Sequence, residues 1–352
     1  MQKYRFLTLL LIFSVIGLLL AGCGDKRAAK DVMVDAFKKQ ATLNSYSFQG
    51  TMKFQVDADQ ALLDSDPNAA AFIDALKKSQ LTYHGSTSVE PFQTELVLDA
   101  KVEFQGMSMN FNMPILFNQD KLWVKVPAID LFPELAQLKG KFVEVDFKQL
   151  SEMSGQPVTF SQNMKAQREV GQKAVDIFFK HVGNEYFADV AKDAFPLPEG
   201  ITEGRVVKFQ MTNDNFAPLV KKLLGSVIPE VLDVIATSEL GKDMKKEDLD
   251  QTKADVQEAL KEFEASGDEW KKSVNIKKGD IIFIIDKENN VPYQMFDVSL
   301  QITPPEEKGS FTLGVTFDQK LTNIGQTPKW EITTPKPEEI VPLSDLMGGA
   351  NF

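Results

Sequence analysis

The spacing of hydrophobic residues changes from helical to strand-like near residue 44. Val32, Met33, Ala36 and Phe37 recur at helical spacing within residues 28–43, which predicts an amphipathic helix. Apolar and polar residues then alternate from residue 46 to residue 56, which predicts a strand with one buried face. A short helix is expected to follow over residues 69–80.

The same alternation continues through the rest of the first half. It covers five further segments, residues 81–90, 94–105, 105–117, 120–127 and 141–147. So many neighbouring strands of this kind predict an antiparallel sheet with one apolar face. Such a face must be covered, and helical spacing marks residues 149–153, 163–191 and 247–266 as the covering helices.

The second half has a similar order of elements. A strand is expected at residues 204–211, and a long helical excursion over residues 213–265 follows it, with Gly267 as a C-cap. Four strands are then expected, at residues 270–276, 280–286, 292–302 and 310–321. The stretches 276–281 and 286–292 have the composition of hairpin turns.

This order predicts an α+β fold in which an antiparallel sheet with one apolar face is covered by helices. The first sheet-plus-helix half spans residues 44–190, and the second spans residues 191–335 with the inserted helices 213–265. Strand, helical excursion and several strands occur twice, so a duplication of residues 44–150 as 200–335 is a hypothesis. The Pro-rich tail, residues 336–352, is expected either to pack as an extended arm or to stay mobile.

The N-terminus has the layout of an export signal. Lys3 and Arg5 precede an apolar run over residues 6–20, and small residues follow. At about 15 residues the run is short for a transmembrane helix, which needs about 20. The run ends in "LAGC", which resembles the lipobox of bacterial lipoproteins. The resemblance implies that residues 1–22 are a signal peptide, that Cys23 is acylated, and that residues 23–43 form a lipidated terminus and first helix on the extracytoplasmic side of the cell membrane.

The chain contains 26 Phe and 12 Met residues against 5 Tyr and 3 Trp. Phe lacks a polar group and Met adapts its shape, so this composition suits either a large core or an apolar cavity. The alternating stretches place several such residues on one face, which we predict as a tentative ligand-binding surface. These residues are Met52, Phe54, Leu98, Phe104, Met107, Met109, Phe111 and Met113.

Other functions have little material in the sequence. The net charge is −11 and no basic stripe occurs, which argues against nucleic acid as a partner. The one Cys excludes a disulfide within the chain and a cysteine zinc cluster. The two His residues, His84 and His181, have no partner identifiable from the sequence, and Gly-rich phosphate loops are absent. We therefore expect no enzyme activity, no cofactor and no metal site.

Segments such as "KLWVKVP" followed by "GKFVEVDFKQL", within a helix–meander–helix order, make the chain resemble the LolA/LolB and LppX-like superfamily. The resemblance implies that the antiparallel sheet is curved, an incomplete barrel covered by helices, and that a lipid or other apolar molecule is the ligand. Two hypotheses remain at this stage. The protein either binds such a ligand in a cavity between sheet and helices, or is a ligand-free envelope scaffold, chaperone or sensor that acts through protein contacts.

Overall fold

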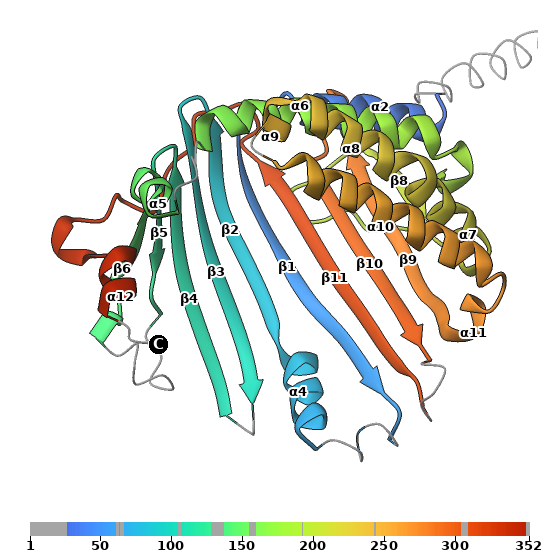
Figure 1. Cartoon of the computed structure of the whole chain (residues 1–352), viewed down its shortest axis with the longest axis horizontal. Coiled ribbons are helices and arrows are strands. Elements are labelled where there is room, and N and C mark those ends of the chain that lie inside the picture. The colour runs from blue at the N-terminus through green and yellow to red at the C-terminus, as the bar shows by residue number, and fades with distance from the viewer. Residues whose placement is uncertain are drawn as a thin grey trace, which may run out of the picture.

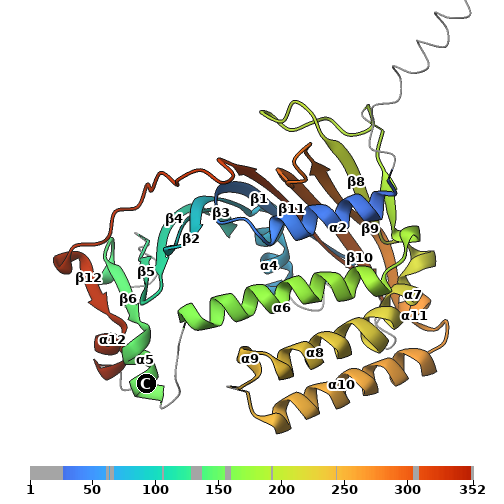
Figure 2. The same cartoon turned by 90° about the horizontal axis from the view of Figure 1, so that it is seen from above.

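The computed structural model describes residues 27–60, 63, 67–104, 107–127, 137–154, 160–191, 193–242, 244–303 and 309–349. The predicted signal peptide and Cys23 therefore lie outside the described residues. Within those residues, twelve strands form a single sheet that curves without closing into a barrel (Figures 1 and 2). The predicted fold class, a curved antiparallel sheet covered by helices, is confirmed.

The strands follow the order β12-β6-β5-β4-β3-β2-β1-β11-β10-β9-β8-β7. Their bounds are β1 (Ser45–Ala58), β2 (Gln80–Val89), β3 (Phe92–Phe104), β4 (Met107–Asn118), β5 (Lys121–Lys125), β6 (Phe142–Asp146), β7 (Phe187–Asp189), β8 (Arg205–Gln210), β9 (Val274–Ile285), β10 (Tyr293–Ile302), β11 (Phe311–Thr322) and β12 (Ile340–Pro342). Neighbouring strands pair antiparallel, except that β12 pairs parallel with β6. The two predicted halves meet where β1 pairs with β11 and where β7 pairs with β8. The duplication hypothesis stays a prediction.

The main helices are α2 (Ala29–Gln40), α4 (Pro67–Lys78), α5 (Phe147–Ser154), α6 (Phe160–His181), α7 (Asn213–Lys222), α8 (Ile228–Thr237) and α10 (Lys246–Ala265). Helix α6 crosses the concave side of the sheet, and α8 and α10 lie beyond it (Figure 2). Helix α2 packs against α6 and β7. Helix α10 ends with Ser266 and then Gly267 at φ 55°, as the predicted C-cap requires.

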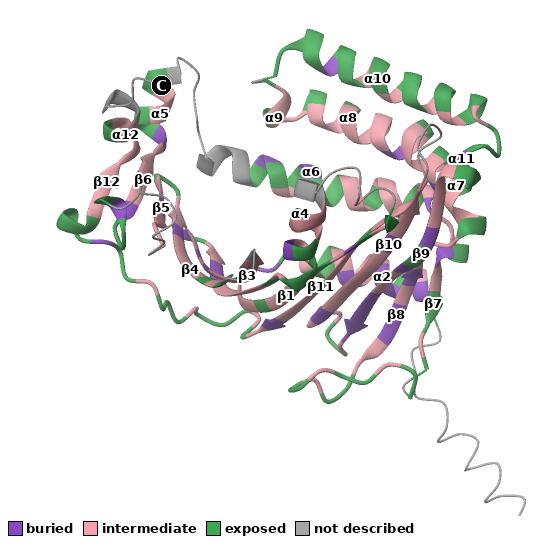
Figure 3. Ribbon diagram, turned by 90° about the horizontal axis from the view of Figure 1, so that it is seen from below, coloured by how far each residue is buried: buried purple, intermediate pink, exposed green. Residues whose placement is uncertain are grey.

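The main core lies between α2, α6 and strands β7–β9. Helix α2 buries Ala29, Val32, Met33 and Ala36, which confirms the face predicted from helical spacing. Against this face pack Phe179 of α6 and the concave-side residues of the sheet, including Val207. Burial therefore concentrates in the second half of the sheet, whereas α10 is mostly exposed (Figure 3).

Two expectations about individual elements were wrong. Residues 270–276 and 280–286 are not two strands joined by a turn, because Val274–Ile285 form the single strand β9 after a short helix α11 (Trp270–Ser273). Strand β9 pairs with both β8 and β10, and the register shift opposite Ser299 and Leu300 absorbs Lys277 as a bulge. The helix expected over 163–191 ends at His181, and the chain then enters β7.

Two segments cover parts of the convex face. The loop after β7 packs Phe195 and Ile201 over β8–β10. The C-terminal arm, residues 323–342, crosses to the other edge and packs Ile332 and Ile340 over β4–β6 (Figure 2). The described part of the predicted tail, residues 336–352, contains β12 and the helix α12 (Leu343–Gly349), and the expectation of an extended arm or a mobile tail stays a prediction.

A buried carboxylate holds this arm. Glu95 of β3 is 2% exposed. Its Oε2 accepts hydrogen bonds from the backbone N–H groups of Glu331 at 2.8 Å and Ile332 at 2.9 Å. A buried charge is tolerated only when it is paired in this way.

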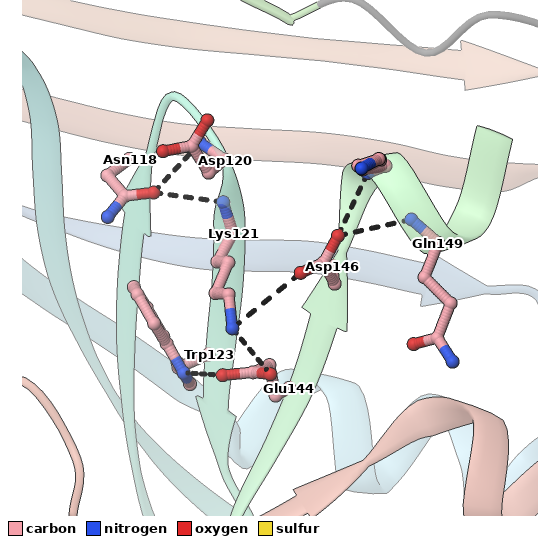
Figure 4. Close-up of polar contacts among 8 residues, drawn as sticks. Asn118, Asp120, Lys121, Trp123, Glu144, Asp146 and Gln149 are labelled. Carbon is pink, nitrogen blue, oxygen red and sulfur yellow. Dashed lines mark hydrogen bonds and ion pairs between the residues drawn. The ribbon is translucent and has the colours of Figure 1, made fainter.

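A polar network holds the β5–β6 hairpin (Figure 4). Glu144 accepts hydrogen bonds from Trp123 Nε1 at 2.7 Å and from Lys121 Nζ at 2.9 Å. Asp146 Oδ1 accepts the backbone N–H groups of Lys148 and Gln149, as a helix N-cap does at the start of α5. These residues have structural partners, so the network explains the local fold rather than a binding site.

Candidate functional site

An apolar cavity of about 490 Å³ lies between the concave face of the sheet and the helices. Its lining residues are Met33, Phe37, Ala174, Val175, Phe178, Phe179, Phe187, Phe209, Leu219, Leu223, Ile281, Phe283, Gln294 and Phe296. Seven of these are Phe, and Gln294 is the single polar residue among them. This volume lies within the range of about 300–1,000 Å³ that is usual for small-molecule sites.

The floor of the cavity consists of alternate residues of four adjacent strands. Phe296 of β10 pairs with Ile281 of β9, which pairs in turn with Phe209 of β8. Phe209 pairs with Phe187 of β7. Directly paired residues project from the same side of a sheet. The strand alternation thus aims these side chains at one volume.

Helices α2 and α6 and the start of the helical excursion form the other walls. Phe37 of α2 contacts Phe283 edge-on, with ring centroids 5.4 Å apart, and Phe179 at 5.8 Å. Leu219 belongs to α7, and Leu223 opens a π-helical turn (Leu223–Val227) that joins α7 to α8. Such turns often occur at functional sites.

The cavity is electrically neutral. The side chain of Gln294 donates to Gln319 Oε1 at 2.6 Å, so its amide is already hydrogen-bonded within the sheet. Several lining side chains, among them Phe37, Phe178 and Phe296, are only half-buried. An apolar surface that remains accessible inside a folded protein can be covered by an apolar ligand, with about 0.8 kcal/mol gained per buried methylene group.

Charged groups lie around this cavity and not in it. Glu230 of α8 contacts two residues at the end of α6, Lys180 Nζ at 2.9 Å and His181 Nε2 at 2.7 Å. These two hydrogen bonds, first that of Lys180 and then that of His181, lower the pKa of the Glu230 carboxyl. Together they join the outer helix α8 to the helix that forms the cavity wall.

The residues predicted as a ligand-binding surface share one face, as expected. Leu98 pairs with Met113, and Phe111 and Met109 follow on the same side of β4. Met52 and Phe54 of β1 lie on this side as well, and Phe54 is 37% exposed. Phe104 and Met107 form a backbone pair in the same register, but their side chains lie outside the described residues.

None of the six predicted residues whose side chains are described belongs to the lining of the 490 Å³ cavity. They occupy the same concave side in the neighbouring strands. Phe317 of β11 connects the two regions. The centroid of its ring lies 5.7 Å from that of Phe296 in the cavity, and its backbone pairs with that of Met52 on β1. Whether the predicted residues contact a ligand stays a prediction.

Sequence reasoning did not locate this cavity because its residues come from eight separate elements. A signal was present in each half, because the helix around "DIFF" and the strand "IIFII" place Phe178, Phe179 and Phe283 at core positions. Alternation identifies which face of a strand is apolar. It does not identify the strands that a helix leaves incompletely covered.

Both histidines have a carboxylate neighbour that the sequence did not reveal. His181 Nε2 contacts Glu230, and His84 Nε2 lies 3.3 Å from Glu331 of the C-terminal arm. Among the described residues, no three His, Cys, Asp or Glu side chains gather as the ligands of a metal ion would. Within the same part of the chain, no helix has the length and apolar character needed to cross a membrane.

Comparison with known proteins leaves the family open. No protein-family model and no curated protein matches the chain. Among solved structures, the fold is similar to the crystal structure of LprF from Mycobacterium bovis, with 12% sequence identity over 88% of this chain and 96% of that chain. The TM-score is 0.26, which is too low to transfer any property between the two proteins.

Proposed function

We propose that this protein is a membrane-tethered lipoprotein that binds a lipid or another apolar molecule in the cavity between its sheet and helices. The single observation that carries the proposal is a 490 Å³ cavity lined by seven Phe residues with one polar side chain, which is itself hydrogen-bonded. Such a lining offers no group for covalent chemistry. It offers apolar contact only, which suits binding or carrying rather than catalysis.

The energetics favour an acyl chain as the bound group. About ten methylene groups transferred from water into this lining would contribute about 8 kcal/mol before the cost of association. Met52, Phe54, Leu98, Met109, Phe111 and Met113 extend the apolar surface beyond the cavity. In the proposal they support the part of a longer ligand that the cavity does not hold.

The tether is part of the proposal. Acylation of Cys23 would place helix α2, which begins at Ala29, within a few residues of the membrane surface. Two or more acyl chains anchor a protein stably, whereas one holds it only marginally. The cavity wall formed by α2 would then lie close to the membrane from which an apolar ligand could be taken.

The test is native mass spectrometry with lipid extraction on residues 24–352, purified without detergent. Ala174→Trp fills the cavity from α6, and Gln172→Trp places the same side chain on an exposed position of the same helix as a control. The expected result is a stoichiometric apolar molecule on the wild type and on Gln172→Trp, and a reduced amount on Ala174→Trp. Leu223→Trp, from the opposite wall, repeats the test if Ala174→Trp does not fold.

A second candidate function has one observation in its favour. Helix α8 is strongly apolar, yet none of its residues is buried. That surface suits a ligand-free scaffold, chaperone or sensor with a protein partner. A ligand-free mass for all three folded proteins would contradict the lipid-binding proposal and support this alternative.

A further inference from the structure

A second cavity, about 450 Å³ in volume, lies on the convex face of the sheet, opposite the apolar one. Its floor consists of polar residues that are paired across three strands. Thr51 of β1 pairs with Thr82 of β2 and with Asp318 of β11. Gln49 pairs with His84 and Lys320 in the same way. Their side chains therefore project from one side of the sheet.

The loop after β7 forms one wall of this convex-face cavity. Pro198 and Glu199 belong to the lining, and Lys320 Nζ donates a hydrogen bond to the carbonyl oxygen of Glu199. This bond holds the loop against β11. On the other side His84 lies beside Glu331 of the C-terminal arm. The loop after β7 and the C-terminal arm run over different parts of the convex face (Figure 2).

Two groups in the cavity have accessible side-chain oxygens that are not hydrogen-bonded to any described residue. Tyr293 is only 9% exposed, and no described residue forms a hydrogen bond with its hydroxyl group. The half-buried carboxylate of Asp318 likewise has no hydrogen-bond or ion-pair partner among the described residues. Both oxygens remain accessible in the cavity, so a ligand there can form hydrogen bonds with them.

The proton affinities agree with this geometry. Burial, and then the charge of Asp318, raises the pKa of Tyr293 to about 12. Burial raises the pKa of Asp318, against the opposing effect of Lys53. At neutral pH the Tyr293 hydroxyl therefore keeps its proton and can donate it in a hydrogen bond. A neighbouring ligand hydroxyl could donate to Asp318 and accept from Tyr293.

We propose that the convex-face cavity binds a sugar unit or a similar polyhydroxylated molecule through Asp318 and Tyr293. A sugar hydroxyl both donates and accepts, so it matches a carboxylate, a phenol, the Thr51 and Thr82 hydroxyls and the Gln49 amide together. The ring of Tyr293 and the side chain of Pro198 supply apolar surface for the C–H groups of a sugar. The cavity volume is typical of small-ligand sites. This site is independent of the apolar cavity on the other side of the sheet.

The test is saturation-transfer difference NMR on residues 24–352 with glucose, galactose, mannose and arabinose, and with their methyl glycosides. Tyr293→Phe removes only the hydroxyl group, and Tyr46→Phe, on the concave side, is its matched control. Asp318→Asn removes the charge, and Asp280→Asn on β9 is the control for that change. The expected result is transfer to at least one sugar with the wild type and both controls. The affinity for that sugar should fall by about tenfold or more in Tyr293→Phe and in Asp318→Asn.

The two forms of the ligand are distinguished within the same experiment. Transfer to methyl glycosides supports a sugar carried on a larger molecule, and transfer to reducing sugars alone supports a free sugar. Absence of transfer to every sugar overturns the proposal. Equal transfer with all four variants, shown to be folded by circular dichroism, overturns it as well. Transfer to ethanolamine instead of the sugars would show that Asp318 binds an amine and would overturn the assignment of ligand class.

Discussion

The bond between Glu95 and the C-terminal arm provides a quantitative test of how the convex face is held together. Glu95 accepts hydrogen bonds from the backbone N–H groups of Glu331 and Ile332, and both of these residues belong to the arm. The substitution Glu95→Gln keeps an acceptor of the same size and removes the charge. Because charge-assisted hydrogen bonds are about twice as strong as neutral ones, the expected cost is about 1–2 kcal/mol.

The substitution Glu95→Leu removes the acceptor altogether. Two N–H groups then lose their partner beside the apolar cluster of Leu116, Trp123 and Phe142. At about 1–3 kcal/mol for each buried unsatisfied group, the arm should lose about 2–6 kcal/mol of local stability. This loss acts on the contact between arm and sheet, so it should appear as local opening before it appears as global unfolding.

Amide hydrogen exchange over residues 323–342 measures this opening directly. Exchange should accelerate by about tenfold in Glu95→Gln and by more than that in Glu95→Leu, since about 1.4 kcal/mol corresponds to a factor of ten. The control is Glu103→Gln, a similar change on the same strand at a position that lies away from the arm. Unchanged exchange in Glu95→Leu would show that apolar packing alone holds the arm, and the reasoning about the buried carboxylate would be wrong.

Three further outcomes follow from the contacts described above. The pKa of Glu230 is lowered by its hydrogen bonds with Lys180 and His181. The contact should therefore stabilise α8 at pH values above the ordinary Glu pKa, and this stabilisation should be lost as the pH falls through the lowered pKa. Hydrogen exchange of residues 228–237 should show this acid-dependent step, and Glu230→Gln should abolish it. The pKa of Tyr293 is raised to about 12, so its contribution to stability should be complete below its ordinary pKa of 10.0 and disappear as pH rises through 12. Tyr293→Phe should therefore raise the pH midpoint of alkaline unfolding, measured by circular dichroism. An unchanged midpoint would contradict this assignment. Trp123→Phe leaves Glu144 without its indole donor, so urea denaturation should show a loss of about 1 kcal/mol, which a Glu144→Gln background should largely remove.

Most of the sheet could be predicted from the sequence because alternation is a local property. Residues 94–117 alternate so regularly that β3 and β4 lie within two residues of their predicted ends. The turn expected at residues 276–281 failed for the opposite reason. "IKKGDI" has turn composition, but hydrogen bonds from both β8 and β10 keep it extended, and this pairing involves residues far away in the chain.

The apolar cavity could be predicted in kind but not in place. The excess of Phe indicated that an apolar site was feasible. Met109 and Phe111 lie on the correct side of the sheet but away from α2 and α6, whose crossing determines where the space remains. The polar cavity gave no local signal, because Asp318 and Tyr293 come from different strands and Pro198 from a distant loop.

The pairing of β1 with β11 joins the beginning of the folded chain to its end. Ser47 lies opposite Thr322, so the middle of the sheet cannot form until almost all residues between these two are available. Contacts of such sequence separation make folding slow. If the chain crosses a membrane with its N-terminus first, β1 would pair with β2 while its other edge stays unpaired until β11 arrives. An unpaired strand edge of this kind promotes aggregation. Attachment of the N-terminus to a surface before the last strands form would keep such partly folded chains apart.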